Sequence, residues 1–200
     1  MKLFYSVPSP YARKARMVLI EARLEGQVET EAIDPWTDPP GFRDNNPLGK
    51  VPTLVRDDGP TVFQSNAVCE YLNAVGSAQL YPDDGPSRWT ALRQLALSDG
   101  ILDASVTVRM ELTFHEPDQI SKKLVERQEL SVARALDTLE SEAEALGGPV
   151  TIGQIAVACA LGYRDFRFAD VDWRSAQPKL TDWFAAFADR PSITATKPTS

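Results

Sequence analysis

The chain has 200 residues, of which 43% are hydrophobic and 24% are charged, values typical of a globular protein with a packed core. This length excludes a long repeat array and allows one large domain or two small ones. The 21 Lys and Arg residues against 28 Asp and Glu residues give a net charge of −7, which disfavours nucleic acid and anionic membrane surfaces as partners.

Counts of the reactive residue types restrict the chemistry further. The single histidine, His115, argues against most zinc sites, and the sequence contains no Gly-rich phosphate loop for a nucleotide. Cys69 and Cys159 cannot form a disulfide framework, and no apolar run approaches the length that crosses a bilayer. We therefore expect a cytoplasmic protein with no metal, no nucleotide, no nucleic acid partner and no membrane partner.

Strand and helix patterns alternate in the first part of the chain. The run KLFYS predicts a short strand, followed by a helix over 10–23 and a second strand over 28–33. After a proline-rich loop, VPTLVRDDGPTVF predicts two short strands joined by a turn, and a helix is expected over 65–75. This order indicates a small mixed sheet with helices packed on it, which is the thioredoxin-like pattern.

A domain boundary is expected between residues 77 and 87, where Gly, Pro, Ser and Asp are dense. Ten of the 15 prolines precede residue 87, so turns concentrate in the first part. We assign 1–77 to the thioredoxin-like domain and 87–200 to a second domain.

The second part has helical periodicity throughout. Its first helix, from Ser87 towards Phe114, repeats apolar residues at three- and four-residue steps, and further helices are expected over 118–145, over 152–168 and after Pro178. The third is apolar nearly all round and should be the buried centre of an all-helical bundle. Thr151 with Gln154 forms a capping box at its start. The apolar residues of the first helix are Trp89, Leu92, Leu95, Leu102 and Val106.

The pair Ser9-Pro10 marks the start of the first helix. Serine is a preferred N-cap and proline a preferred first helical residue, so capping alone would explain the pair. The same helix start also offers positive dipole charge to an anion, and a thiolate is such an anion. A Ser9 hydroxyl that donates a hydrogen bond to a thiolate would lower the thiol pKa without a histidine base.

Two further segments suggest ligand contacts. In Lys50-Val51-Pro52, a proline at a strand start can be cis and leave the backbone of the preceding residue available to a peptide-like ligand. Gln64-Ser65 opens the next helix and offers a second anion site, suited to a carboxylate. Capping by Ser65 is the alternative interpretation.

Taken together, SPYARK, NPLGKVPTL and QSNAVCEYL resemble the three glutathione-contacting regions of the glutathione transferase superfamily. In the second part, ALSDGILDA, TIGQIAVACALGY and RPSITATKP are similar to the all-helical domain of the same family. The resemblance covers nearly the whole chain and is strongest to bacterial serine-type members. Gln154 departs from it, because the family usually has Asp at this position of the capping box.

The resemblance implies a role for each matching residue. Ser9 would hold the glutathione thiolate, although Tyr5 is a competitor because other classes use a tyrosine at the end of the first strand. Val51 would bind the cysteinyl backbone with Pro52 as the cis residue, and Lys50 would approach the glycine carboxylate. Gln64 and Ser65 would bind the γ-glutamyl end.

An electrophile pocket is expected between the domains. We single out Arg109 as an anchor for an acidic substrate, and Asp99 as an acidic residue near the glutathione amine across a homodimer interface. The other residues expected to line the pocket are Val7, Pro8, Tyr11, Val106, Met110 and Phe114.

The function implied is a glutathione transferase, with glutathione as co-substrate and a small, hydrophobic electrophile as the second substrate. Glutathione-dependent isomerisation, dehalogenation or ether cleavage on the same site is an alternative. A non-catalytic binding or scaffold protein is another. The residues do not distinguish detoxification from a catabolic pathway.

Overall fold

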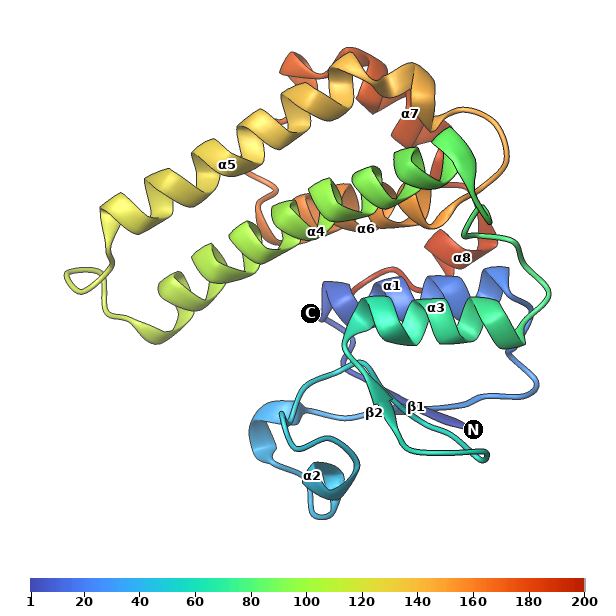
Figure 1. Ribbon diagram of the computed structural model, residues 1–200. Helices are drawn as coiled ribbons and strands as arrows, with labels where there is room; N and C mark the ends of the chain where they lie inside the picture. The colour runs from blue at the N-terminus through green and yellow to red at the C-terminus, as the bar shows by residue number, and fades with distance from the viewer. Residues whose placement is uncertain (200) are drawn as a thin grey trace. The chain divides into compact units, whose positions relative to one another are not determined.

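The computed structural model describes residues 1–199, which divide into two compact units (Figure 1). The first comprises Met1–Tyr81 together with the segment 190–199, and the second comprises Pro82–Asp189. A small mixed α/β domain followed by an all-helical domain is the predicted fold class, and the structure confirms it. The predicted domain limits, 1–77 and 87–200, remain a prediction.

The sheet of the first unit has the strand order β2-β1-β3-β4. β1 is parallel to β2 and antiparallel to β3, and β3 is antiparallel to β4. Leu3 of β1 lies opposite Leu54 of β3, and both side chains are fully buried. The strands are β1 (Lys2–Tyr5), β2 (Glu29–Ala32), β3 (Thr53–Val55) and β4 (Val62–Phe63).

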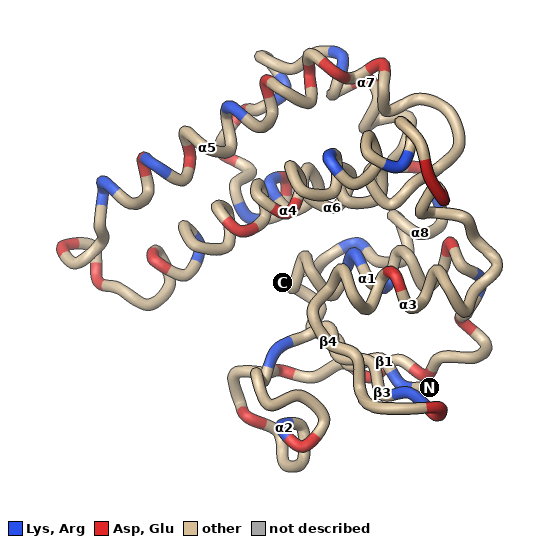
Figure 2. Tube along the Cα trace, viewed as in Figure 1, with Lys and Arg blue, Asp and Glu red and all other residues tan. Residues whose placement is uncertain are grey.

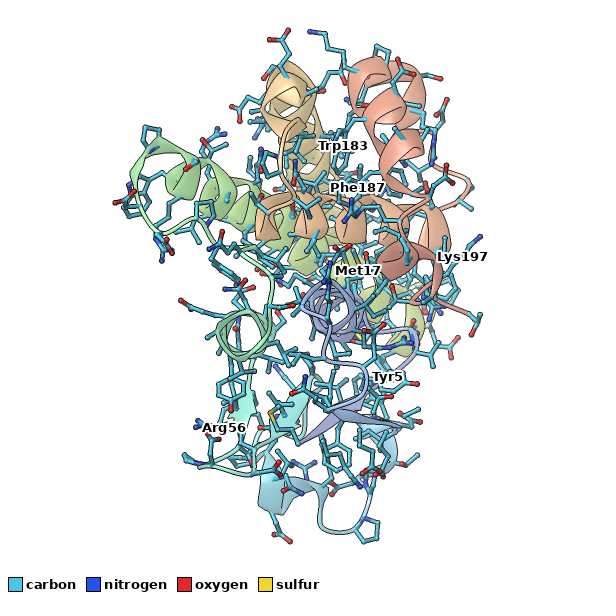
Figure 3. The ribbon with its side chains drawn as sticks, turned by 90° about the vertical axis from the view of Figure 1, so that its right-hand side faces the viewer. Tyr5, Met17, Arg56, Trp183, Phe187 and Lys197 are labelled. Atoms are coloured by element: carbon cyan, nitrogen blue, oxygen red, sulfur yellow. The ribbon has the colours of Figure 1, made fainter. Side chains whose placement is uncertain are left out.

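Two helices, α1 (Pro10–Glu21) and α3 (Ser65–Val75), pack side by side against this sheet (Figure 1). Their apolar faces are buried, as the sequence periodicity predicts, with Met17 of α1 and Leu72 of α3 fully inaccessible (Met17 is labelled in Figure 3). The proline-rich segment is more ordered than the loop that the sequence predicts. It contains η1 (Pro35–Thr37) and α2 (Phe42–Asn45).

The segment after Asp189 packs with the first unit, although it follows the helical unit in the chain. Its short helix α8 (Pro191–Thr194) contacts α1. Arg190 donates two hydrogen bonds to the Glu21 carboxylate, at 3.0 and 2.8 Å, and the Ser192 hydroxyl donates a third at 2.6 Å. Burial opposes ionisation of Glu21, but these donors more than offset it and hold its pKa below the usual value.

The helical unit is organised around α6, whose residues are buried through most of its length, as predicted. α4 packs on both α5 and α6. Figure 2 shows basic and acidic residues interspersed along α5, whose apolar side buries Val132, Leu136 and Leu139. The helices are α4 (Gly85–Phe114), α5 (Lys122–Ser141), η2 (Ala143–Leu146), α6 (Ile152–Arg167), η3 (Arg174–Ala176) and α7 (Pro178–Phe187).

Side chains from α6 and α7 bind backbone carbonyls around η2. Gln154 donates to the carbonyls of Leu146 (2.8 Å) and Gly147 (3.3 Å), and its Oε1 accepts the Thr151 N–H at 2.7 Å as the predicted capping box requires. Trp183 Nε1 of α7 also donates to the Leu146 carbonyl, at 3.0 Å. An aspartate could supply the acceptor but not the two donors, which explains the glutamine at position 154.

Helices α4 and α6 approach each other closely at Gly153. A Cβ at this position would lie 2.4 Å from Gln94 Oε1 and 2.8 Å from the Ala91 carbonyl oxygen, so only glycine fits. Trp89, predicted on the buried face of α4, is instead 69% exposed. The buried residues of α4, such as Ala91, Ser98 and Ser105, recur at seven-residue steps on one face of the helix, and Trp89 lies nearly opposite that face.

Candidate functional site

The turn from β1 into α1 positions Ser9. The Ser9 backbone is extended, with φ −77° and ψ 118°, and its Oγ accepts a hydrogen bond from the Ala12 N–H at 3.2 Å. The Ser9 N–H donates to the Ser6 carbonyl at 3.1 Å, which fixes the turn. A hydroxyl has one donor and two acceptor positions, so the Ser9 O–H remains able to donate while it caps the helix.

Tyr5, the alternative to Ser9, ends β1 (labelled in Figure 3). The guanidinium of Arg16 in α1 lies over its ring, 4.3 Å from the centroid. Ser9 therefore belongs to the helix N-terminus, whereas the Tyr5 ring packs against the side of that helix.

The segment before β3 is held by Asn46, which is 1% exposed. Asn46 Nδ2 donates to the Lys50 carbonyl at 2.8 Å and to Thr53 Oγ1 at 2.9 Å, and its Oδ1 accepts the Leu48 N–H at 3.0 Å. Thr53 Oγ1 also donates to the Lys50 carbonyl, at 2.7 Å. The Lys50 backbone is thus fixed, while its exposed ammonium group has no ion-pair partner among residues 1–199.

The Val51-Pro52 peptide bond is cis, as the resemblance implied. Within the described chain, neither the N–H nor the carbonyl of Val51 has a hydrogen-bond partner. Both groups are therefore available to a peptide-like ligand.

Gln64 lies in the left-handed region, at φ 73°, immediately before α3. Its Oε1 accepts hydrogen bonds from the N–H groups of Asn66 (2.8 Å) and Ala67 (3.3 Å). Gln64 is thus the residue that caps α3, and the sequence-based alternative of capping by Ser65 is wrong. The Ser65 hydroxyl has no hydrogen-bond partner in residues 1–199.

The strand register brings these segments to one edge of the sheet. Phe4 lies opposite Thr53, and Thr53 lies opposite Phe63. The next residues along the three strands therefore meet at the same edge, because β3 is antiparallel to both neighbours. The segments at this edge are the Ser9 turn, Val51-Pro52 and Gln64-Ser65.

A buried lysine joins the two helices behind this edge. Lys14 of α1 is fully buried, and its Nζ donates to Asn66 Oδ1 at 2.7 Å, one residue after Ser65. Neither Lys14 nor Asn46 was predicted from the sequence to belong to the site. The available signals were a lysine four residues before the buried Val18, and an Asn-Pro pair that is typical of a side-chain-stabilised turn.

The residues expected to line an electrophile pocket fall in both units. Val7 and Tyr11 are half-buried and Pro8 is exposed in the first unit. On α4, Val106, Arg109 and Met110 are half-buried, and Phe114 is 59% exposed. Asp99, which was expected near the glutathione amine of a partner subunit and not in the pocket, is also half-buried. The pocket itself remains a prediction.

Family models match both units. One described as the glutathione S-transferase N-terminal domain matches residues 8–75, and one described as the glutathione S-transferase C-terminal domain matches residues 122–186. The chain is also 32% identical to the uncharacterized GST-like protein YibF of Escherichia coli K12, over 99% of this chain and 98% of that protein. The chain belongs to the glutathione transferase family.

Solved structures of the family resemble the whole chain. A glutathione transferase family member from Pseudomonas fluorescens Pf-5, solved with bound glutathione, is 38% identical, with a TM-score of 0.94 over 100% of this chain and 99% of that chain. A second structure from the same source, solved with S-(propanoic acid)-glutathione, matches at 38% identity and a TM-score of 0.91 over the full length of both chains.

One group of relatives is much longer than this transferase-family chain. Elongation factor 1-gamma of Carassius auratus is 28% identical over 78% of this chain, which spans only 35% of that protein. None of the helices within 1–199 is long and apolar enough to span a membrane, and no group of His, Cys, Asp and Glu in that range is arranged to hold a metal ion.

Proposed function

We propose that this protein is a glutathione transferase in which the Ser9 hydroxyl donates a hydrogen bond to the glutathione thiolate. The observation that carries the proposal is the geometry of Ser9, whose Oγ accepts the Ala12 N–H and so keeps its own O–H for the sulfur. The accepted bond also orients the hydroxyl at the positive end of α1.

The expected size of the effect is sufficient for thiol activation. A hydrogen bond to a charged group contributes about 1.5–3 kcal/mol. One pKa unit corresponds to about 1.4 kcal/mol, so Ser9 alone would lower a thiol pKa from about 8.5 by about one to two units. The glutathione thiol would then be substantially ionised at neutral pH.

The remaining glutathione contacts follow the sheet edge. The unpartnered backbone groups of Val51, next to Pro52, suit the cysteinyl residue of glutathione, and the Lys50 ammonium suits its glycine carboxylate. The Ser65 hydroxyl and the start of α3 suit the γ-glutamyl carboxylate, with Gln64 beside them. The glutathione and the glutathione conjugate bound in the Pseudomonas structures support glutathione as the ligand.

In the reaction, the thiolate sulfur supplies the electron pair of a new carbon–sulfur bond to the electrophile. The electrons displaced at that carbon leave with a leaving group, or pass to a neighbouring carbon that then takes a proton. Isomerisation, dehalogenation and ether cleavage begin with the same attack. Product analysis by mass spectrometry distinguishes them from simple conjugation.

The test is the ultraviolet absorbance of bound thiolate, titrated against pH in the wild type and in Ser9→Ala. We expect the midpoint to rise by about one to two pH units in the variant, while glutathione still binds. An unchanged midpoint would refute the role of Ser9.

Because Ser9→Ala also removes a helix cap, Ser121→Ala is the matched control. Ser121 caps α5 by accepting the Leu124 N–H at 3.4 Å, in the other unit. Both variants should lose about 1 kcal/mol of stability, but Ser121→Ala should leave the thiol titration unchanged. Ser9→Thr keeps the hydroxyl and should restore the wild-type midpoint.

A binding or scaffold function is the second candidate. The similarity to elongation factor 1-gamma favours it, because that relative is named as a translation factor and not as an enzyme. Glutathione binding with no turnover across an electrophile screen would support this function over the first. For either function we infer that the protein is cytoplasmic and forms a homodimer in which Asp99 lies near the glutathione amine of the partner. Sedimentation equilibrium would test the dimer, and an Asp99→Asn variant would test the contact with glutathione.

A further inference from the structure

Three arginines lie near one another on α4 and α6, and they differ in their partners. Arg164, 2% exposed, donates two hydrogen bonds to the Glu129 carboxylate, at 3.0 and 2.8 Å, and a third to Ser105 Oγ at 3.3 Å. Arg109 and Arg167 have no ion-pair partner in residues 1–199. One arginine is therefore neutralised within the fold and two are not.

The helix register places Arg109 opposite Arg167. Gly153 of α6 meets Gln94 of α4, and eleven residues later on both helices Arg164 meets Ser105, so the two helices run parallel in step. One further turn brings α4 to Arg109 and α6 to Arg167. The positive charges of both arginines also act on Tyr163, which precedes Arg167 by one turn of α6.

Arg167 and Tyr163 are partly shielded from water. The Arg167 Nε is buried and has no hydrogen-bond partner, and its guanidinium lies 4.1 Å from the centroid of the Phe166 ring. Tyr163 is 4% exposed, and burial raises its pKa against the opposing charges of Arg167 and Arg109. Its hydroxyl therefore stays protonated at neutral pH and can donate a hydrogen bond.

Two acidic residues close to Arg164 already have other partners. Glu129 is bonded to Arg164, and Asp165 accepts hydrogen bonds from Arg174 and from Trp173 Nε1. In a chain of net charge −7, two half-buried arginines without a carboxylate partner are an unusual local excess of positive charge. An unpaired charge in a dry environment is costly unless an anion binds it.

We propose that Arg109, Arg167 and Tyr163 form a binding site for the carboxylate of a small organic acid. Arg167 already donates one hydrogen bond to the Tyr163 hydroxyl oxygen, so the Tyr163 O–H, the Arg109 guanidinium and the remaining N–H groups of Arg167 are the donors that a carboxylate would accept from. Val106 lies on the same face of α4 as Arg109, and Met110 follows it, so the rest of the ligand meets apolar side chains. The identification of this acid as the electrophilic substrate rests on the proposed function. The electrophilic substrate would then be an anion and not a neutral hydrophobic compound.

The test compares two glutathione conjugates by calorimetry on the full chain. S-(2-carboxyethyl)glutathione carries the carboxylate, and S-propylglutathione has a similar side chain without it. We expect wild-type protein to bind the acid at least about tenfold more tightly. Arg109→Gln, Arg167→Gln and Tyr163→Phe should each remove most of this preference and leave S-propylglutathione binding unchanged.

Arg134→Gln is the matched control, because it removes one exposed arginine charge from α5 of the same unit. It should preserve the preference. A wild-type preference below twofold, or an equal loss in Arg134→Gln, overturns the carboxylate site.

Failure of the proposed function has a different signature. If neither conjugate nor glutathione itself binds the wild type, the transferase function is refuted, and the site is then judged with hexanoate and hexanamide. Hexanoate binding that Arg109→Gln and Arg167→Gln abolish supports the site, and hexanoate binding that is absent or insensitive to both variants overturns it.

Discussion

The sheet edge of the first unit and the η2 connection of the second differ in how their polar groups are satisfied. Around η2, the carbonyls of Ala145, Leu146 and Gly147 all accept hydrogen bonds from side chains of other helices. At the sheet edge, the Lys50 ammonium and the Ser65 hydroxyl have no such partner in residues 1–199. Polar groups that are hydrogen-bonded within the protein stabilise the fold, whereas polar groups without internal partners remain available to a ligand.

The largest loss of stability is expected for Gly153→Ala, in the helical unit. The new Cβ would meet backbone and side-chain atoms of α4 at less than 3 Å, so the helices must separate. We expect a loss of about 3 kcal/mol or more, measured by urea denaturation followed by circular dichroism.

Gly100→Ala is its control, because a Cβ at position 100, within α4, would contact nothing within 4 Å. This variant should gain about 0.5–1 kcal/mol from helix propensity. Equal effects of the two substitutions would contradict a close approach of the helices at Gly153.

A smaller effect is expected for Glu21→Gln, which tests how the 190–199 segment is attached. Loss of the charge-assisted hydrogen bonds from Arg190 and Ser192 should cost about 1–3 kcal/mol at pH 7. Because the pKa of Glu21 is lowered in the folded protein, this stability is present above its unfolded pKa of about 4.3 and is lost as the pH falls further.

Urea denaturation of the wild type and Glu21→Gln at pH 7 and pH 3.5 checks this prediction, and the difference between them should shrink at the lower pH. Glu25→Gln, an exposed glutamate of the same unit, should change stability by less than about 0.5 kcal/mol at either pH. A pH-independent difference would argue that Glu21 acts through packing alone.

The smallest effect on stability, below about 0.5 kcal/mol, is expected for Lys50→Gln. This variant tests whether the Lys50 ammonium group, which has no internal partner, contributes to glutathione binding. Calorimetry should find glutathione binding about two- to tenfold weaker, and binding of the glycine ethyl ester of glutathione unchanged. Lys2→Gln removes the same charge at the other end of β1, where Lys2 pairs with Glu29 and Glu31, and should bind glutathione as the wild type does.

Sequence periodicity predicted the elements that local patterns determine. The helix over 65–75 has the predicted limits, and the α6 core and the mixed sheet were also expected. Trp89 was misplaced because three-residue steps drift around a helix of 3.6 residues per turn, and the buried face of α4 lies nearly opposite Trp89. The attachment of 190–199 to α1 depends on contacts between residues more than 160 positions apart, which no local pattern encodes.

The candidate site was predictable only where its residues carry a local sequence signal. Ser9-Pro10 and Val51-Pro52 are local signals, and the structure has a capped helix and a cis bond at these positions. Gln64 as the cap of α3 was not predicted, because a glutamine at positive φ is uncommon. Lys14 and Asn46 act across the fold, so their partners appear only once the chain is folded.

The four tryptophans are distributed so that fluorescence reports almost entirely on the helical unit. Trp36, the one tryptophan before residue 82, is 71% exposed, so unfolding barely changes its surroundings. In the second unit, Trp173 is 5% exposed, and Trp183 is hydrogen-bonded to Leu146 and stacked on Phe187 at 4.9 Å (Figure 3). An emission shift in denaturant would therefore follow the loss of the helical bundle, and a spectroscopic signal from the glutathione-binding unit would have to be introduced by labelling.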